Sequence, residues 1–231
     1  MMTSVCPEIQ VTKKEDLVFL GSPAGAQARR VCLTDKRGAL DTMMSRLSQV
    51  SAHHALFLLK NCFAMPRLLY FLRSAPCFLE QDLLESHDEL LRKALENLLN
   101  IKFSVTSFEQ ALLPVCFSGL GVTSAAQLAA SAFLASASGC QQLCDVILAA
   151  TPDYTIPCYN DAFLQWTQQS GLSSVPLDRS LQKSWTHPIR KKIFLKLSED
   201  LSPFDRTRLF AFSGKEAGAW LNASEEKPAE Q

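Results

Sequence analysis

Two apolar-striped segments separated by prolines fill residues 51–100, and they constrain the fold more than any other part of the chain. In the first segment, apolar side chains recur at steps of three or four residues, which places them on one face of an α-helix. Ser51 suits the N-cap of that helix because its hydroxyl can accept a backbone N–H. Pro66 has no N–H to donate and disfavours helical geometry at the residue before it. The sequence therefore predicts a helix from Ala52 that kinks or restarts near Pro66, and Pro76 closes the unit.

The second segment carries a leucine-rich stripe along residues 83–98 and charged residues beside it. Asp88 and Arg92 are four residues apart, as are Glu89 and Lys93, and opposite charges at this spacing support an exposed helical face. We therefore expect an amphipathic helical pair, with these four charged side chains on its outer side.

The two segments and their flanks resemble a known family. The run HHALFLLKNCFAMPRLLYFLRSAPCF, followed by HDELLRKAL, is similar to the region just C-terminal to the polymerase palm in reverse transcriptases of non-LTR, LINE-type retrotransposons. The resemblance extends from about Leu17 to Ala223 and rests on the order of its motifs more than on any one of them. The further motifs are LVFLGSP (17–23), LLPVCFSGLGVTSAAQLAASAFLAS (112–136), QKSWTHP (182–188) and RTRLFAFSGKEAGAWLNA (206–223). The resemblance implies that the chain corresponds to the thumb and post-thumb region of such an enzyme.

The composition is that of a globular protein whose charges balance. With 231 residues, 47% hydrophobic and 20% charged, the chain is long enough for one large or two small domains. Lys plus Arg and Asp plus Glu both number 23, so the formal net charge is +0. Phosphate contacts need an uncompensated cationic surface, so this balance argues against strong free-standing nucleic-acid binding but leaves room for a local basic face.

The eight cysteines and the N-terminus indicate the compartment. Only Cys140 and Cys144 are close in sequence, and no second Cys/His pair has the spacing of a zinc site. We therefore predict buried free thiols. The N-terminus lacks the apolar region of a signal peptide, and no uncharged stretch is apolar enough to span a bilayer. These features favour an intracellular, reducing location, in the cytoplasm or the nucleus.

The patterns together predict a mainly α fold of about eight to ten helices with a minor N-terminal strand pair. Residues 1–33 are expected to form short strands (8–11 and 17–20) and loop, a remnant of the palm edge that the resemblance implies. Thr34 or Asp35 is expected to cap the first helix, and Pro188 to begin a later one. We expect a thumb-like helical bundle at 34–104, a second helical subdomain packed on it at 105–222, and a disordered tail at 223–231.

Catalytic motifs are missing from the sequence. Reverse transcription uses two metal ions held by palm carboxylates, and the similarity begins after the point where those would lie. The chain has no Asp-Asp pair, and phosphate-loop, GxSxG and HExxH motifs do not occur. His87 lies on an apolar stripe and is expected to be a hydrogen-bonded core residue. We therefore predict a chain without catalytic activity, metal site or cofactor.

Basic residues are the candidates for function. Contact with the phosphates and sugars of a duplex requires Lys or Arg on one exposed face of the thumb-like helices. The candidate nucleic-acid-binding residues are Lys60, Arg67, Arg73, Arg92, Lys93, Arg190, Lys191 and Lys192. For each of them the alternative is an ordinary solvated charge paired with a carboxylate, such as Asp88 for Arg92. Phosphate binding predicts that most of them converge on one concave face.

Two functions are consistent with the sequence. The resemblance implies a non-catalytic C-terminal segment that contacts an RNA/DNA hybrid or a DNA duplex backbone through basic helices. The alternative is a helical structural or protein-interaction module with no nucleic-acid role, whose partner is the missing polymerase palm or another protein. An exposed apolar patch would favour the second. Neither a membrane nor a small-molecule substrate is indicated as a partner.

Overall fold

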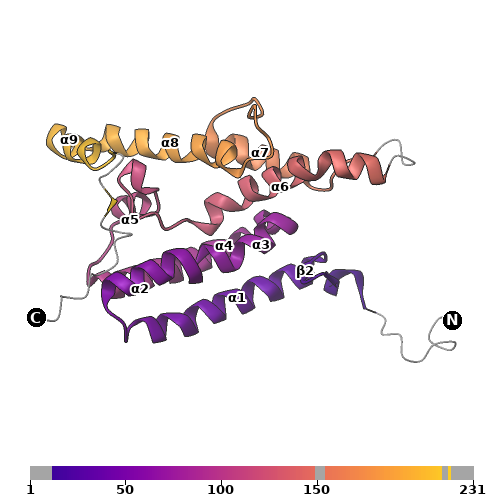
Figure 1. The fold of residues 1–231 in the computed structure, drawn as a ribbon, viewed down its shortest axis with the longest axis horizontal. Helices are drawn as coiled ribbons and strands as arrows, with labels where there is room; N and C mark the ends of the chain where they lie inside the picture. The colour runs from indigo at the N-terminus through magenta and orange to yellow at the C-terminus, as the bar shows by residue number, and fades with distance from the viewer. Residues whose placement is uncertain (1–11, 149–153, 215–217, 220–231) are drawn as a thin grey trace, which may run out of the picture.

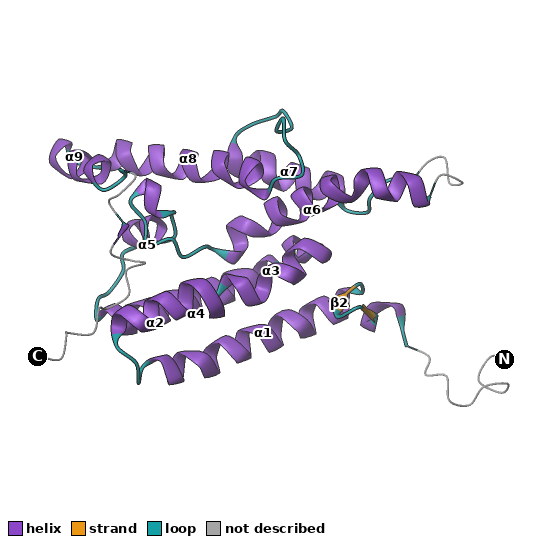
Figure 2. Ribbon diagram, in the orientation of Figure 1, coloured by secondary structure: helices purple, strands orange, loops and turns teal. Residues whose placement is uncertain are grey.

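The computed structural model of the chain describes residues 12–148, 154–214 and 218–219. Within these residues it contains nine α-helices and one two-stranded antiparallel sheet, as Figure 2 shows. The predicted mainly α fold with a minor strand pair is confirmed. The strand expected at 8–11 and the tail expected at 223–231 lie outside the described residues.

The helices form two layers, one containing α1–α4 and the other α5–α9 (Figure 1). The first-layer helices are α1 (Ala26–Leu47), α2 (Ala52–Leu58), α3 (Met65–Ser74) and α4 (Gln81–Leu99). The second-layer helices are α5 (Val105–Ala111), α6 (Ala125–Ile147), α7 (Tyr159–Ser170), α8 (Gln182–Asp200) and α9 (Pro203–Ala211). Helix α6 contacts both α3 and α4, so it joins the two layers.

The strand pair is a tight hairpin ahead of α1. Strands β1 (Val18–Phe19) and β2 (Ser22–Pro23) pair antiparallel, with Phe19 opposite Ser22. The two turn residues, Leu20 and Gly21, have φ of 49° and 77°. Positive φ at both positions defines a type I′ turn, whose twist matches the strands it joins. The Tyr70 hydroxyl donates to the Leu20 carbonyl at 2.7 Å and ties the hairpin to α3.

The first helix begins earlier than the sequence predicts. It starts at Ala26, with Gly25 as N-cap, and not at Thr34 or Asp35, so residues 26–33 are helix where strand or loop was expected. Gly25 has no side chain that could cap the helix, so the sequence shows no sign that the helix begins there. A Cβ at Gly25 would lie 2.1 Å from the Glu15 carbonyl oxygen, so only glycine fits this close approach. Ion pairs from Arg29 and Arg30 to Glu80 hold the first turns of α1 against the start of α4.

The break predicted near Pro66 is confirmed. A π-helical turn spans Leu59–Phe63, after which α3 restarts at Met65 with Pro66 in its first turn, where no N–H is required. By length and composition, the apolar stretch Ala52–Ser74 would be able to cross a membrane. The core helix of a globular protein meets the same criterion, and Leu59, Leu68 and Leu72 are buried here.

Asp88 lies inside the structure and not on the outer side of α4, where the sequence pattern placed it. Its carboxylate accepts the backbone N–H groups of Ala125 and Ala126 at 2.7 and 3.2 Å and the Ser124 hydroxyl. Ser124 in turn caps α6 by accepting the N–H of Gln127. The carboxylate therefore satisfies the N-terminus of a helix 36 residues further along the chain. The four-residue spacing to Arg92 did not indicate this partner.

A pair of tryptophans joins α7 to α8. The Trp166 indole N–H donates to the Trp185 carbonyl at 2.8 Å, and both side chains are fully buried. Pro188 lies inside α8, which begins at Gln182, so the prediction that this proline begins the helix is wrong. Proline disturbs the carbonyls of the preceding turn. The carbonyl that Pro188 leaves without its helical donor is that of Ser184, four residues earlier, whereas the indole binds the next carbonyl along, that of Trp185.

The largest hydrophobic cluster lies between the layers. It includes Leu72 of α3, Leu84 of α4, Leu134 of α6 and the two tryptophans. A second cluster joins the other ends of α1, α2 and α4 to the segment around α5. Residues on both sides of the predicted boundary near residue 104 contribute to each cluster, so the two layers share their cores. The division into domains stays a prediction.

The prediction of buried thiols is wrong for several cysteines. All seven cysteines among the described residues are free, but Cys62, Cys116 and Cys140 are exposed. Cys77 is buried, and burial raises the pKa of its thiol to about 12. Cys6 lies outside the described residues. Cys62 was expected on the apolar stripe, but it lies in the π-helical turn, where the helical periodicity changes and its side chain is exposed.

We predict that Asp88→Ala lowers the free energy of unfolding by about 3 kcal/mol, because three donors at a buried helix N-terminus would be left without a charged acceptor. Chemical denaturation measures the change. Glu89→Ala, at the exposed neighbouring position, serves as the matched control and is expected to cost about 0.5 kcal/mol or less. Equal effects of the two substitutions would contradict the capping role of Asp88.

Candidate nucleic-acid interface

Helix α8 carries the densest group of cations in the described chain. The helical periodicity places its four lysines on the side that faces solvent. Trp185, Ile189 and Phe194 point into the core, where they are buried. Lys183, His187 and Lys191 follow one another at four-residue steps, and Lys192 and Lys196 form an adjacent column, so these side chains share the outer face. Residues 179–198 contain no Asp or Glu, and the outer face is therefore uncompensated over about 20 Å of helix.

Part of this face forms one wall of a groove of about 620 Å³. The groove is also lined by Ser170 at the end of α7 and by Leu172 in the turn that follows. The turn is possible because Gly171 adopts a φ of 76°. The α8 side of the groove is lined by His187, Pro188, Lys191, Lys192, Leu195, Lys196 and Glu199.

The lysines of the groove differ in how they are held. The Lys192 ammonium donates to the Gln168 carbonyl at 3.1 Å, near the C-terminus of α7, where a cation is favoured by the helix dipole. Two of its three N–H donors remain for a ligand. Within the part of the chain that the structure describes, Lys191 and Lys196 are exposed and make no hydrogen bond or ion pair. Their charges face solvent along the groove.

Arg190 is turned away from this face, although it directly precedes Lys191. Its guanidinium lies between α8 and the start of α6, where Leu112 and Leu128 surround it and the Thr123 hydroxyl accepts one hydrogen bond at 3.4 Å. Burial lowers the pKa of Arg190, because the charged form loses hydration without gaining a close carboxylate. The structure therefore separates Arg190 from the two lysines with which the sequence grouped it.

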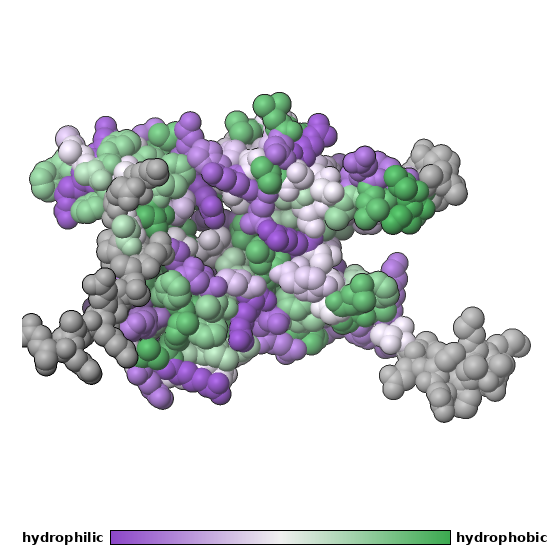
Figure 3. Space-filling model, in the orientation of Figure 1, coloured by the Kyte–Doolittle hydropathy of each residue, from purple (hydrophilic) through white to green (hydrophobic). Residues whose placement is uncertain are grey.

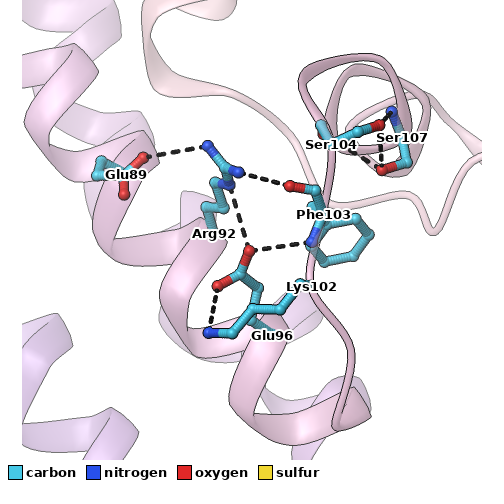
Figure 4. A network of polar contacts seen from close by, with 7 residues as sticks. All are labelled: Glu89, Arg92, Glu96, Lys102, Phe103, Ser104 and Ser107. Atoms are coloured by element: carbon cyan, nitrogen blue, oxygen red, sulfur yellow. Dashed lines mark hydrogen bonds and ion pairs between the residues drawn. The ribbon is translucent and has the colours of Figure 1, made fainter.

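Arg92 belongs to a polar network at the end of α4 (Figure 4). Its side chain lies 3.4 Å from the Glu96 carboxylate and 3.9 Å from Glu89, and it donates to the Phe103 carbonyl. Glu96 accepts the Phe103 N–H at 3.0 Å and the Lys102 ammonium at 3.2 Å. These contacts fasten the segment before α5 to α4. Arg92 is paired, as the alternative interpretation expected, but with Glu96 and Glu89 and not with Asp88.

The remaining candidates lie in separate surroundings. Lys60 is partly buried beside Gly121, and burial lowers its pKa. The Arg67 guanidinium lies over the Phe63 ring, 5.3 Å from its centroid. Arg73 donates two hydrogen bonds to the Gln182 side chain, at 3.0 and 2.7 Å. Lys93 is exposed on α4.

The structure thus brings together only part of the predicted set. Lys191 and Lys192 share a groove, whereas Arg92 and Arg190 are engaged elsewhere, so the predicted convergence of the basic residues on one concave face is not seen. The candidate set predicted from the sequence did not include Lys196, which lies four residues after Lys192. The set also missed Lys183, although the four-residue steps from Lys183 to Lys191 are visible in the sequence.

No group of three or more His, Cys, Asp or Glu residues within the described ranges is arranged to hold a metal ion. Comparisons with models of protein families, with curated proteins and with solved structures found no match. The residues of the chain itself must therefore support any proposal about function.

We predict that Arg190→Met leaves the free energy of unfolding unchanged or raises it by up to about 1 kcal/mol, because a methionine fills the site without a desolvated charge. Urea denaturation measures this change, with Lys191→Met as the exposed control on the same helix, where little change is expected. A loss of stability well above that of the control would mean that the Thr123 hydrogen bond outweighs desolvation.

We also predict that the network around Glu96 is sensitive to acid. The Phe103 N–H and then Lys102 hold the pKa of Glu96 below its ordinary value. A group with a lowered folded-state pKa adds stability above its unfolded pKa of about 4.3 and loses it as pH falls through the folded value. The stability difference between the natural chain and Glu96→Gln should be largest near neutral pH and shrink below about pH 4. Urea midpoints across this range measure it, and a difference independent of pH would contradict the prediction.

Proposed function

We propose that the chain is a non-catalytic nucleic-acid-binding segment that contacts the phosphate backbone through the outer face of α8. The observation that carries this proposal is the groove in which Lys191, Lys192 and Lys196 gather without a compensating carboxylate until Glu199. Phosphates are the ligands that such a face suits, because each contact releases condensed counterions and adds affinity without reading sequence.

The location of the charge matters more than its total. The chain is neutral overall, so long-range attraction of a polyanion is weak. The α8 cations nevertheless act locally, because none of the α8 lysines forms an ion pair within the described residues, whereas Arg29, Arg30 and Arg92 are paired with carboxylates. Free positive charge therefore remains on α8.

The resemblance to the thumb and post-thumb region of LINE-type reverse transcriptases supports the same proposal. A segment of that kind would lie along an RNA/DNA hybrid or DNA duplex, next to the polymerase palm. Its contact would be with backbone, which agrees with lysines on one helical face and with the absence of catalytic motifs from the sequence. Such a protein would work in the cytoplasm or the nucleus.

A protein-interaction module is the second candidate, because large apolar side chains are exposed in several places, of which two are at the ends of elements. Val18, Phe19 and Leu20 project from the hairpin, where Leu20 is 83% exposed. Val146 and Ile147 are exposed near the end of α6, where hydrophobic residues gather at one end of the molecule in Figure 3. Patches of this type mark docking sites for other proteins when they are contiguous.

We predict salt-dependent binding to an RNA/DNA hybrid, measured by fluorescence anisotropy at about 50 and about 200 mM salt. The double variant Lys191→Gln/Lys196→Gln should bind more weakly, because it removes two cations from the groove. The slope of log affinity against log salt should fall by about 0.9 for each phosphate that the variant no longer neutralises.

The matched control is Arg37→Gln/Arg46→Gln, which removes the same charge from exposed positions of α1. It should bind like the natural chain if the α8 face is the interface. Equal weakening by both variants would indicate a general charge effect. If the folded protein does not bind saturably at low salt, the proposal fails and the interaction module remains.

A further inference from the structure

We propose that the α8 groove receives an unpaired nucleotide, so that the chain prefers a single strand or an overhang to a blunt duplex. This inference rests on the proposed function and names its substrate class. It is carried by the composition of the groove, which joins cations to an apolar floor.

The apolar floor consists of Leu172, Pro188 and Leu195. A contact with duplex backbone alone would not require these apolar side chains. Leu172 and Leu195 are each 45% exposed and line the groove together with Pro188. The surface of a duplex that meets a protein face is phosphate and sugar, with the faces of the bases stacked inside. A single strand exposes those base faces, and binding sites for it combine a cationic track with flat or apolar side chains on which the bases lie.

The arrangement of polar groups sets where each part of a nucleotide would lie. Lys191 and Lys196, which have no other partner within the described chain, suit the phosphates on the solvent side. Lys192, held by the Gln168 carbonyl, narrows the groove beside the Gly171 turn. The His187 ring adds an aromatic side chain to the groove lining, and it contacts Phe117, with 5.6 Å between the ring centroids.

Size and charge also fit a nucleotide. A groove of about 620 Å³ falls within the range of small-molecule sites and has room for one nucleotide with its phosphate. Glu199 also lines the groove, and its negative charge repels a phosphate placed beside it. The phosphates of a bound strand would therefore lie nearer Lys191 than Glu199.

The test compares a labelled single strand of mixed pyrimidine sequence with a blunt duplex of the same length, titrated by anisotropy at matched salt. The natural chain is expected to bind the single strand more tightly. Leu172→Gln/Leu195→Gln removes the apolar floor and leaves the charge unchanged. It should weaken single-strand binding by about tenfold, which is the scale of removing the support of one base, and leave duplex binding unchanged.

The matched control is Leu164→Gln, an exposed apolar position on α7 outside the groove. It should bind both ligands like the natural chain, and circular dichroism checks that each variant is folded. If the duplex binds as tightly as the single strand, or if the floor variant weakens both equally, the inference is overturned while the proposed function stands.

If neither nucleic acid binds, both proposals fall together. An acidic amphipathic peptide is titrated as a third ligand, because it too would match lysines around an apolar floor. Saturable binding of that peptide without binding of either nucleic acid would assign the groove to a protein partner, which contradicts the inference and supports the interaction module.

Discussion

The buried N-terminus of α6 is the constraint on which the two-layer fold depends. The first turn of a helix presents N–H groups that have no partner within the helix, and water satisfies them at most protein surfaces. In α6 the first turn is buried, with Ser124 and Ala125 almost fully enclosed. The Asp88 carboxylate supplies the missing acceptors from the opposite layer. Removing water from this helix end is therefore possible only because α4 delivers a charge to it.

The composition of α6 follows from the same position. Alanine and serine occupy most of the stretch from Ala125 to Ala137, and most of these side chains are buried. The buried residues lie on several sides of the helix, because neighbours surround it. Small side chains allow α3, α4, α7 and α8 to approach the helix together. Larger residues would force those neighbours apart. With the inner face of α8 fixed against α6 by Trp185 and Ile189, its other side is left for lysines.

Signals that act within a few residues could be predicted from the sequence, and they determine the fold class. Pro66 interrupts its helix for a reason that is present in the proline itself, and Ser124 caps α6 from the adjacent position. Signals that act across the fold could not be predicted. Nothing near Asp88 indicates the helix that it caps, and Gly25 begins α1 by fitting against a distant carbonyl without a capping side chain. Pro188 lies within α8, whose preceding turn is packed against α7 through Trp185 and Trp166, and nothing next to the proline indicates that packing.

The candidate site shows the same limit at the scale of one residue. Arg190 and Lys191 are adjacent, yet a rotation of about 100° per residue sends one toward α6 and the other to solvent. The usable cations therefore depend on which face α6 covers, and they are few on a chain of zero net charge. A contact of that size gives limited affinity at cellular salt, because few counterions are released. It becomes effective when another binding event raises the local concentration of the strand. A second, tethering contact is therefore the physical requirement for α8 to act on nucleic acid.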